Sequence, residues 1–477
     1  GPGRRQASPP MQPTELAAGH LRRLQAGLTE EQLRALEERL RLLALEASLG
    51  GDRPLWQQAV EGAAWPAPPD AGPPPVDGRT APPGLALEER KGMGRVLVAA
   101  REIARGQALF SEQPLLTIPG CLLEPGRSKG PIMAELERRA LGPAMLDMDV
   151  ICRHFVAASG EELERLRGLE DHEGRTDYAA GRLSDEVAAI AVAHGVLKDG
   201  RSEAALAHFL RVVSVNAHTV PRVRGIMLFF WLSMFSHSCA PNASYSTAAP
   251  GDQGVAATPR ALQRIKAGDV ISMSYLSLQM CLASAPVRRR ILAAQKGFDC
   301  ACSRCKGVDE VRVLPCRCCG GLCVPRGAGS AASWTCSACG HAAADLMLGK
   351  EEKLLSFLLS FDPGDDEQTI HSLLTVVDED LGAEPGTRAE HFLRAWLLLH
   401  LVRVLLGRLS RCPAGDGRLA SRAAAVHRQL LAWARARAPE SLPLLAVELA
   451  VPAVQALQAA RLTDEAAGLA LELEGDL

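Results

Sequence analysis

Hydrophobic residues recur at helical spacing in two long stretches of the chain. Within residues 131–213, Leu163, Leu166 and Leu169 follow one another at intervals of three, and leucine- and alanine-rich segments recur beyond Leu348. Apolar residues repeated every three or four positions form one face of an α-helix. The pattern predicts a helical segment in the middle of the chain and an all-α C-terminal domain over 349–477. Stacked helical hairpins are expected there, although no clean repeat of about 34 residues is visible.

Short apolar runs with strand character lie on both sides of the central helical stretch. Runs at 96–100 and 108–110 flank a turn-like segment, and strand-like signals return at 254–258 and 270–275. Apolar runs of this length bounded by Gly-containing turns are typical of paired strands. We therefore expect a β-rich domain with a helical insertion over residues 85–280.

The first 84 residues have a different pattern. Residues 29–32 resemble a capping box that begins a helix, and leucines at helical spacing follow. Gly50 and Gly51 are expected to end this helix. Between Trp65 and Gly84 the chain is rich in Pro and Gly, which favours an extended linker. One amphipathic helix and a linker are expected over 1–84.

Composition and charge limit the classes of function that fit this sequence. The 477 residues are 47% hydrophobic and 23% charged with a formal net charge of -2, which suits two or three folded domains. No basic stripe is visible, so direct binding to nucleic acid is not expected. The most apolar stretch, 396–406, is broken by His400 and Arg403 and is too short to span a bilayer. We expect a monomer without membrane contact.

The cysteines indicate metal sites in a reducing compartment. Most of the fourteen cysteines lie between Cys300 and Cys339 in Cys-x-Cys and Cys-x2-Cys spacings. Such spacings favour metal ligands over disulfides, so cytoplasm or nucleus is the expected location.

Three thiolates within six residues, at Cys300, Cys302 and Cys305, need a fourth ligand to complete a tetrahedral structural zinc site. Cys239, in the segment 236–242, is the best candidate. Such a site would tie a later segment back onto a mid-chain loop, and we expect the active site beside it.

A second group has the spacing of a zinc ribbon. Two Cys-x2-Cys pairs are separated by sixteen residues and bracket Trp334, with Cys318 and Cys323 as spare thiols that could replace a neighbour. Buried free thiols are the alternative. The predicted ligands of this second zinc ion are Cys316, Cys319, Cys336 and Cys339.

Taken together, the motifs resemble the SET-domain protein methyltransferases, and within them the SET and MYND (SMYD) family, especially its arthropod-type SmydA members. Four segments match in order: 94–106, 237–242, 265–275 and 298–305. The resemblance covers roughly residues 90–345, extends loosely to the C-terminal helices and does not include the first 85 residues.

The resemblance implies contacts to S-adenosylmethionine. Gly94 and Arg95 would lie by its methionine end, where a Gly lets backbone approach a charged ligand, and Asn216 would lie nearby. His237 would present backbone groups to the adenine, and Phe298 would stack on it. Helix or turn capping by Asn216 and core packing of the two rings are the alternatives.

The resemblance also implies a catalytic role for Tyr275, which would orient the cofactor methyl and the incoming amine beside a narrow channel. A lysine amine attacks only as the neutral base, and its ordinary pKa is about 10.4. The site must therefore remove its proton and its water, so placement and desolvation would supply most of the catalysis.

Two positions depart from the family pattern. Ser236 replaces an Asn that contacts the cofactor's amino-acid end, and can supply only part of its hydrogen bonding. Lys296 replaces a second catalytic Tyr, and an ammonium there would repel a sulfonium. The MYND finger is expected to be absent, because only Cys121 and Cys152 lie between Pro114 and Cys239.

The sequence thus predicts an α+β protein: a SET domain over 85–280 with a helical insertion, a post-SET zinc site and zinc ribbon over 281–348, and the helical domain. The predicted activity is S-adenosylmethionine-dependent methylation of a lysine side chain in a protein, such as a histone tail. A catalytically weak or inactive SET scaffold that binds proteins or regulates transcription is the alternative, favoured by Ser236 and Lys296. A zinc-dependent regulator that contacts nucleic acid is disfavoured by charge.

Overall fold

The computed structural model describes most of the chain after residue 80, and the helix and linker predicted before that point lie outside the described residues. The described residues form two compact units. One contains those up to Leu399 together with Ala432–Leu444; the other contains those of 400–431 and the positions after Leu444. The described residues are 81–123, 129–139, 141, 146–169, 179–197, 200–220, 223–247, 256–326, 333–343, 346–360, 366–381, 390–409, 411, 416–445 and single positions after Leu445.

The first strands form a hairpin. β1 (Leu85–Arg90) pairs antiparallel with β2 (Gly94–Ala99), and Arg90 lies opposite Gly94. The predicted pairing of 96–100 with 108–110 is therefore wrong. Gly92 and Gly94 have φ values of +78° and +70°, which glycine adopts readily, so a tight turn brings β1 back onto β2. Ala108 instead forms a bridge with Arg260.

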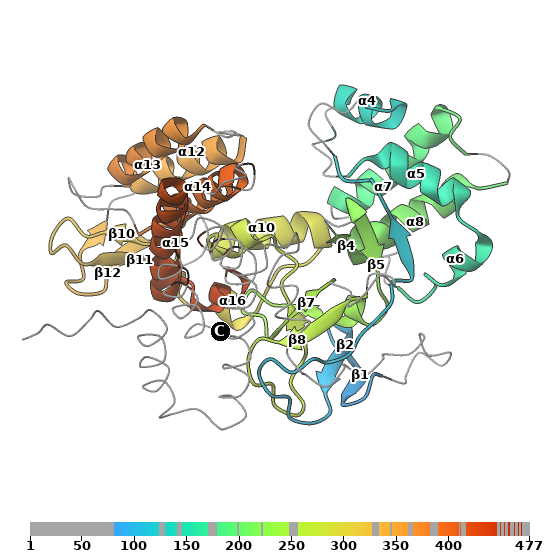
Figure 1. The fold of residues 1–477 in the computed structure, drawn as a ribbon, viewed down its shortest axis with the longest axis horizontal. Coiled ribbons are helices and arrows are strands. Elements are labelled where there is room, and N and C mark those ends of the chain that lie inside the picture. Colours follow the sequence, from blue (N-terminus) through green and yellow to red (C-terminus); the bar gives the residue numbers. More distant parts are fainter. Residues whose placement is uncertain are drawn as a thin grey trace, which may run out of the picture. The chain divides into compact units, whose positions relative to one another are not determined.

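Three further small sheets follow (Figure 1). The order in the largest is β3-β5-β4, and both of its pairings are antiparallel. β6 pairs parallel with β9, and β7 pairs antiparallel with β8. The strands are β3 (Leu116–Ile118), β4 (Ala217–Val220), β5 (Gly225–Leu228), β6 (Ser236–His237), β7 (Ala243–Ser246), β8 (Thr258–Ala261) and β9 (Ser272–Met273).

The predicted helical insertion is confirmed. Side chains cap the first turns: Asp147 accepts from the N–H of Val150, and Ser159 forms a capping box with Glu162. Leu166 and Leu169 lie in turns after a short helix that ends at Glu164. The helices are α4 (Pro131–Arg138), α5 (Met148–Ala157), α6 (Gly160–Glu164), α7 (Ala179–Ala193) and α8 (Glu203–Asn216).

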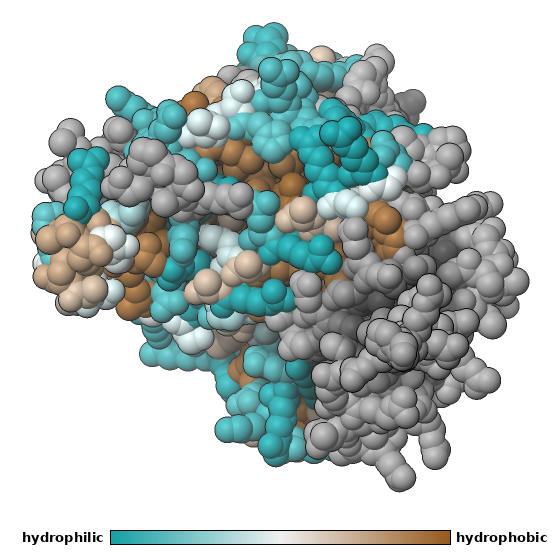
Figure 2. Space-filling model, turned by 60° about the vertical axis from the view of Figure 1, so that its left-hand side comes forward, coloured by the Kyte–Doolittle hydropathy of each residue, from teal (hydrophilic) through white to brown (hydrophobic). Residues whose placement is uncertain are grey.

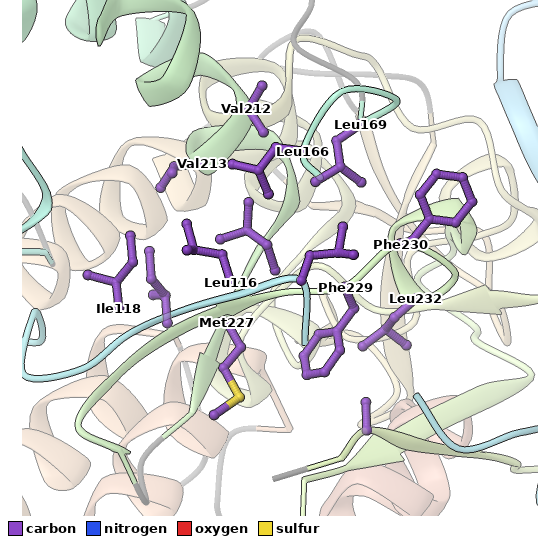
Figure 3. Close-up of a cluster of buried hydrophobic side chains, with 14 of the residues drawn as sticks. Leu116, Ile118, Leu166, Leu169, Val212, Val213, Met227, Phe229, Phe230 and Leu232 are labelled. Atoms are coloured by element: carbon purple, nitrogen blue, oxygen red, sulfur yellow. The ribbon is translucent and has the colours of Figure 1, made fainter. Parts of the chain in front are cut away.

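The core joins this insertion to the three-stranded β3-β5-β4 sheet (Figure 3). Val212 and Val213 of α8 lie over Leu116 and Ile118 of β3, all in one cluster of buried apolar side chains. Burial of such side chains contributes about 1.5–3 kcal/mol each relative to exposure. The core therefore fixes α8 against the sheet, which matters because the last turn of α8 reaches the candidate site.

One buried carboxylate anchors the chain just before the segment 236–242. Glu112 accepts hydrogen bonds from the N–H groups of Phe230, Trp231 and Leu232 at 2.7, 2.8 and 3.0 Å. Burial raises the pKa of Glu112 to about 7, opposed by these three donors. The three bonds fix the start of η3 (Leu232–Met234), which leads directly to β6.

The remaining elements are short helices, a four-stranded sheet and C-terminal helices. No helix among the described residues has both the length and the apolar composition needed to cross a bilayer. They are α9 (Leu278–Cys281), α10 (Ala285–Lys296), α11 (Ser303–Lys306), β10 (Leu314–Pro315), β11 (Leu322–Arg326), β12 (Ser333–Cys336), β13 (Ala342–Ala343), α12 (Leu346–Ser360), α13 (Glu367–Asp380), α14 (Phe392–Leu409), α15 (Gly417–Arg437), η5 (Pro439–Ser441) and α16 (Leu442–Leu445).

The expected α+β class, with a helical insertion and a C-terminal helical region, is confirmed. Among the residues that Figure 2 draws in colour, hydrophilic side chains predominate, with several hydrophobic areas between them.

Candidate functional site

Three aromatic side chains from distant segments meet at the centre of the candidate site. The ring centroids of His237 and Tyr275 are 5.2 Å apart, and that of Phe298 lies 5.9 Å from His237 and 6.4 Å from Tyr275. These separations are typical of packed aromatic rings. The parallel pairing of β6 with β9 places His237 beside the strand that leads to Tyr275.

The imidazole of His237 has a partner on each nitrogen. Its Nδ1 accepts a hydrogen bond from the N–H of Tyr275 at 3.0 Å, so a neutral ring carries its proton on Nε2. That nitrogen lies 3.3 Å from Sγ of Cys239, within donor distance of a thiolate. Burial lowers the pKa of His237 to about 4, which keeps the ring neutral near pH 7.

Tyr275 is fixed at both ends. Its backbone binds His237, and its hydroxyl donates to the carbonyl of Phe235. Burial raises the pKa of the phenol, so the hydroxyl stays protonated at neutral pH. The side chain therefore presents a fixed ring face and a protonated hydroxyl.

Lys296 adds a cation to the aromatic cluster. Its Nζ donates to the carbonyls of Ser214 and Val215 at 2.9 and 2.8 Å and lies 5.8 Å from the centre of the Tyr275 ring. Burial lowers the pKa of Lys296 to about 8. The family pattern has a Tyr at this position and the sequence places an ammonium there, but the two carbonyl acceptors at the end of α8 were not expected from the sequence.

The first thiol cluster forms as predicted. Sγ atoms of Cys239, Cys300, Cys302 and Cys305 all lie within 4.8 Å of one another, and those of Cys239 and Cys305 are 3.5 Å apart. A tetrahedral zinc ion with Zn–S bonds of about 2.3 Å requires sulfur separations of about 3.8 Å. The four thiols therefore fit a structural zinc ion, and they leave no position for a water ligand.

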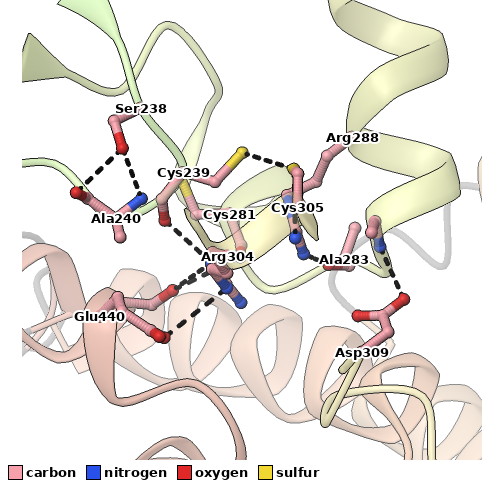
Figure 4. Close-up of polar contacts among 12 residues, drawn as sticks. Ser238, Cys239, Ala240, Cys281, Ala283, Arg288, Arg304, Cys305, Asp309 and Glu440 are labelled. Carbon is pink, nitrogen blue, oxygen red and sulfur yellow. Dashed lines mark hydrogen bonds and ion pairs between the residues drawn. The ribbon is translucent and has the colours of Figure 1, made fainter. Parts of the chain in front are cut away.

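Two arginines border this thiol cluster, and sequence reasoning missed both (Figure 4). Arg288 is buried, with Nη2 3.6 Å from Sγ of Cys305 and Nη1 donating to the carbonyl of Ala283. Arg304 Nη1 donates to the carbonyls of Cys239 and Cys281 at 3.2 and 2.8 Å. A zinc ion with four thiolates carries net negative charge, which a buried guanidinium offsets.

The second thiol cluster also forms. The Sγ atoms of Cys316 and Cys339 are 3.7 Å apart, and those of Cys319 and Cys336 are 3.6 Å apart. All four lie within 4.8 Å of one another on the turns of the four-stranded β10–β13 sheet, so they also fit a structural zinc ion. Cys323 is buried and Cys318 is exposed, and neither belongs to the group of four.

The remaining residues predicted to contact the cofactor are Asn216, Ser236, Arg95 and Gly94. Asn216 ends α8, next to the carbonyls that bind Lys296, and its amide donates to the carbonyl of Val212 at 2.8 Å. Ser236 lies opposite Ser272 in the β6–β9 pair.

Arg95 is exposed and donates to the carbonyl of Gly168. A Cβ on Gly94 would meet none of the described neighbouring atoms within 4 Å, so this backbone is open to a ligand.

A cavity of about 320 Å³ lies elsewhere in the same unit. Arg304, Asp309 and Glu440 are among its lining residues, whereas His237, Tyr275 and Phe298 are not. The aromatic cluster is therefore separate from the lining of this cavity.

No known family model matches the chain, and no curated protein matches it. Among solved structures, the SET domain of LSMT bound to lysine and AdoHcy is 14% identical, with a TM-score of 0.28 and coverage of 83% of this chain and 89% of that one. Rubisco LSMT bound to AdoMet is 11% identical, with a TM-score of 0.29 and coverage of 84% and 90%. The polycomb repressive complex 2 of Chaetomium thermophilum is 11% identical, with a TM-score of 0.19 and coverage of 82% and 32%. At TM-scores this low, a match does not establish a common fold.

Proposed function

We propose that this chain is a SET-domain protein that transfers a methyl group from S-adenosylmethionine to a lysine amine of a protein. The observation that carries the proposal is the convergence of His237, Tyr275 and Phe298, from three of the four family-like segments, beside the four-thiol cluster. The order of those segments along the chain is the second support.

S-adenosylmethionine, when bound, supplies an electrophilic methyl group. In the proposed site Phe298 offers an apolar ring face to the adenine, and the open backbone of Gly94 admits the amino-acid end. Tyr275 holds the incoming amine with its ring and hydroxyl. With the cofactor bound, its methyl group would pass to the neutral amine, the neutral thioether would be the leaving group, and the methylated amine would release a proton to solvent. Exclusion of water by the aromatic rings favours the neutral amine.

In the proposal, both zinc ions are structural. The first would hold Phe298 in place, because Cys300 follows it by two residues, and would fix His237 through Cys239. The second would brace the β10–β13 sheet.

Calorimetric titration of the zinc-loaded protein with S-adenosylmethionine tests the proposal. Micromolar binding that weakens at least about 10-fold in Phe298→Ala supports it, since base stacking on an aromatic ring contributes about 1–3 kcal/mol. Phe357→Ala is the matched control, because Phe357 is 44% exposed on α12. Absence of binding at millimolar cofactor would contradict the proposal.

A second candidate is a SET scaffold with weak or no catalysis. It is favoured by Lys296, whose ammonium lies against the Tyr275 ring where a cationic cofactor would approach. Conversion of Lys296 to Tyr distinguishes the two candidates. A large gain in methyl transfer would show that Lys296 limits an otherwise competent site, and no gain would favour the scaffold.

A further inference from the structure

The ammonium of Lys296 lies in surroundings that would suit a bound amine. Lys296 is in the last turn of α10, which Gly297 closes with a φ of +69°, and α10 packs against α8. Its Nζ donates to the carbonyls of Ser214 and Val215 in the last turn of α8. Carbonyls at a helix C-terminus lack intrahelical donors and carry the negative end of the helix dipole. They therefore select a cationic donor.

An aromatic ring also lies near the ammonium. Nζ lies 5.8 Å from the centre of the Tyr275 ring, within cation–π range, and His218 is the nearby titratable side chain. Burial lowers the pKa of His218 to about 3, so this ring adds no positive charge near pH 7. Two carbonyl acceptors and one ring face therefore lie close to the amine, and we name Ser214, Val215 and Tyr275 the amine cradle.

We propose that Lys296 is an internal occupant of the amine cradle, and that a lysine side chain from another protein enters only when Lys296 withdraws. The inference rests on the proposed function, because it assigns the cradle to the substrate amine. Two ammonium groups cannot share the same two carbonyls, and their repulsion grows as water is excluded. Lys296 therefore acts as a gate on substrate entry.

The first test uses chemical rescue of the full zinc-loaded chain. Lys296→Ala removes the side chain and leaves both carbonyls without their donor. We expect n-butylamine to raise its melting temperature by roughly 1–3 °C in a concentration-dependent way, and n-butanol to do so much less. Wild type and Lys306→Ala, which alters an exposed lysine at the end of α11, should not respond. Equal effects of n-butylamine and n-butanol would overturn the assignment of the cradle to an amine.

The second test separates a gate from a helix-capping lysine. A gate predicts at least about 10-fold more methyl transfer to added lysine peptides in Lys296→Ala than in wild type, whereas Lys296→Arg retains a cation and gains nothing. The gate would be overturned if Lys296→Ala binds S-adenosylmethionine and is stabilised by n-butylamine but transfers no more methyl to the peptides than wild type does.

If Lys296→Ala does not fold, Lys296→Met retains the stem without the two hydrogen bonds, and the same peptide comparison with Lys296→Arg applies. Failure of the proposed function itself would appear as absent cofactor binding in calorimetry, whereas the amine rescue requires no cofactor.

Discussion

The Nδ1 atom of His237 accepts a hydrogen bond from the backbone N–H of Tyr275 at 3.0 Å. The other nitrogen of the same ring lies 3.3 Å from Sγ of Cys239. One imidazole therefore connects the proposed catalytic tyrosine to the first thiol cluster, so that loss of a metal ion there would disturb Tyr275.

Cys239→Ser should reduce the zinc content from two ions per chain to one and weaken cofactor binding, because it removes a ligand and the partner of His237. Atomic absorption and calorimetry measure the two effects. Cys152→Ser is the control, since Cys152 is buried outside both clusters. Unchanged zinc content and folding in Cys239→Ser would disprove the shared first site.

Tyr275→Phe should lower methyl transfer about 100-fold while cofactor affinity changes only a few-fold, because the ring stays and the positioning hydroxyl is lost. Radiolabelled cofactor with a protein mixture reports transfer, and calorimetry reports binding. Tyr245→Phe is the matched control, since its hydroxyl lies 3.0 Å from Nδ1 of His218. Transfer that survives in Tyr275→Phe would remove Tyr275 from the reaction.

The buried ammonium of Lys296 should make stability rise with pH in a defined window. Its folded pKa of about 8 is below the unfolded value of about 10.4, so the unfolded chain binds more protons between these values. The cost of the buried charge is therefore full below pH 8 and declines above it. Tyr275 faces Lys296, and its raised pKa opposes this trend only above about pH 10.

We expect wild type to gain about 1–2 kcal/mol of unfolding free energy relative to Lys296→Met between pH 7.5 and about 9.5. Urea denaturation at the two pH values measures this difference. Lys306→Met provides the exposed control and should show no such trend. A pH-independent difference would mean that Lys296 is protonated to the same extent in the folded and unfolded chains.

Glu112→Ala should destabilise the protein by about 3 kcal/mol or more, because three buried N–H groups would each lose their acceptor. Thermal unfolding measures the loss. Glu137→Ala is the control, since the Glu137 side chain is 66% exposed and pairs with Lys129. A loss no larger than in the control would show that the anchor before η3 is dispensable.

Glu351→Ala should cost about 3–5 kcal/mol, because it leaves the buried Arg312 without its carboxylate. Glu351 Oε1 lies 2.7 Å from Nε of Arg312 and 3.2 Å from Nε2 of His391. Urea denaturation measures the cost. Glu102→Ala, in an exposed pair with Arg264, is the control and should change little. Similar losses in the two variants would contradict a special role for the buried pair.

The sequence by itself determined the features that depend on short spacing. Cys300, Cys302 and Cys305 required a fourth zinc ligand, and helical periodicity predicted the insertion and the C-terminal helices, because ligand number and helix period are local properties. The aromatic candidates His237, Tyr275 and Phe298 were implied by the family resemblance, and the structure brings their rings together.

Only the tertiary structure decided which distant groups meet. The partner of β2 depended on a tight turn, and the acceptors of Lys296 came from the end of α8. Arg288 reached the first thiol cluster from α10, and Arg304, from between Cys302 and Cys305, reached the carbonyl of Cys239. Hydrogen bonds and buried charge depend on distances set by packing of the whole core, and no local pattern encodes those distances.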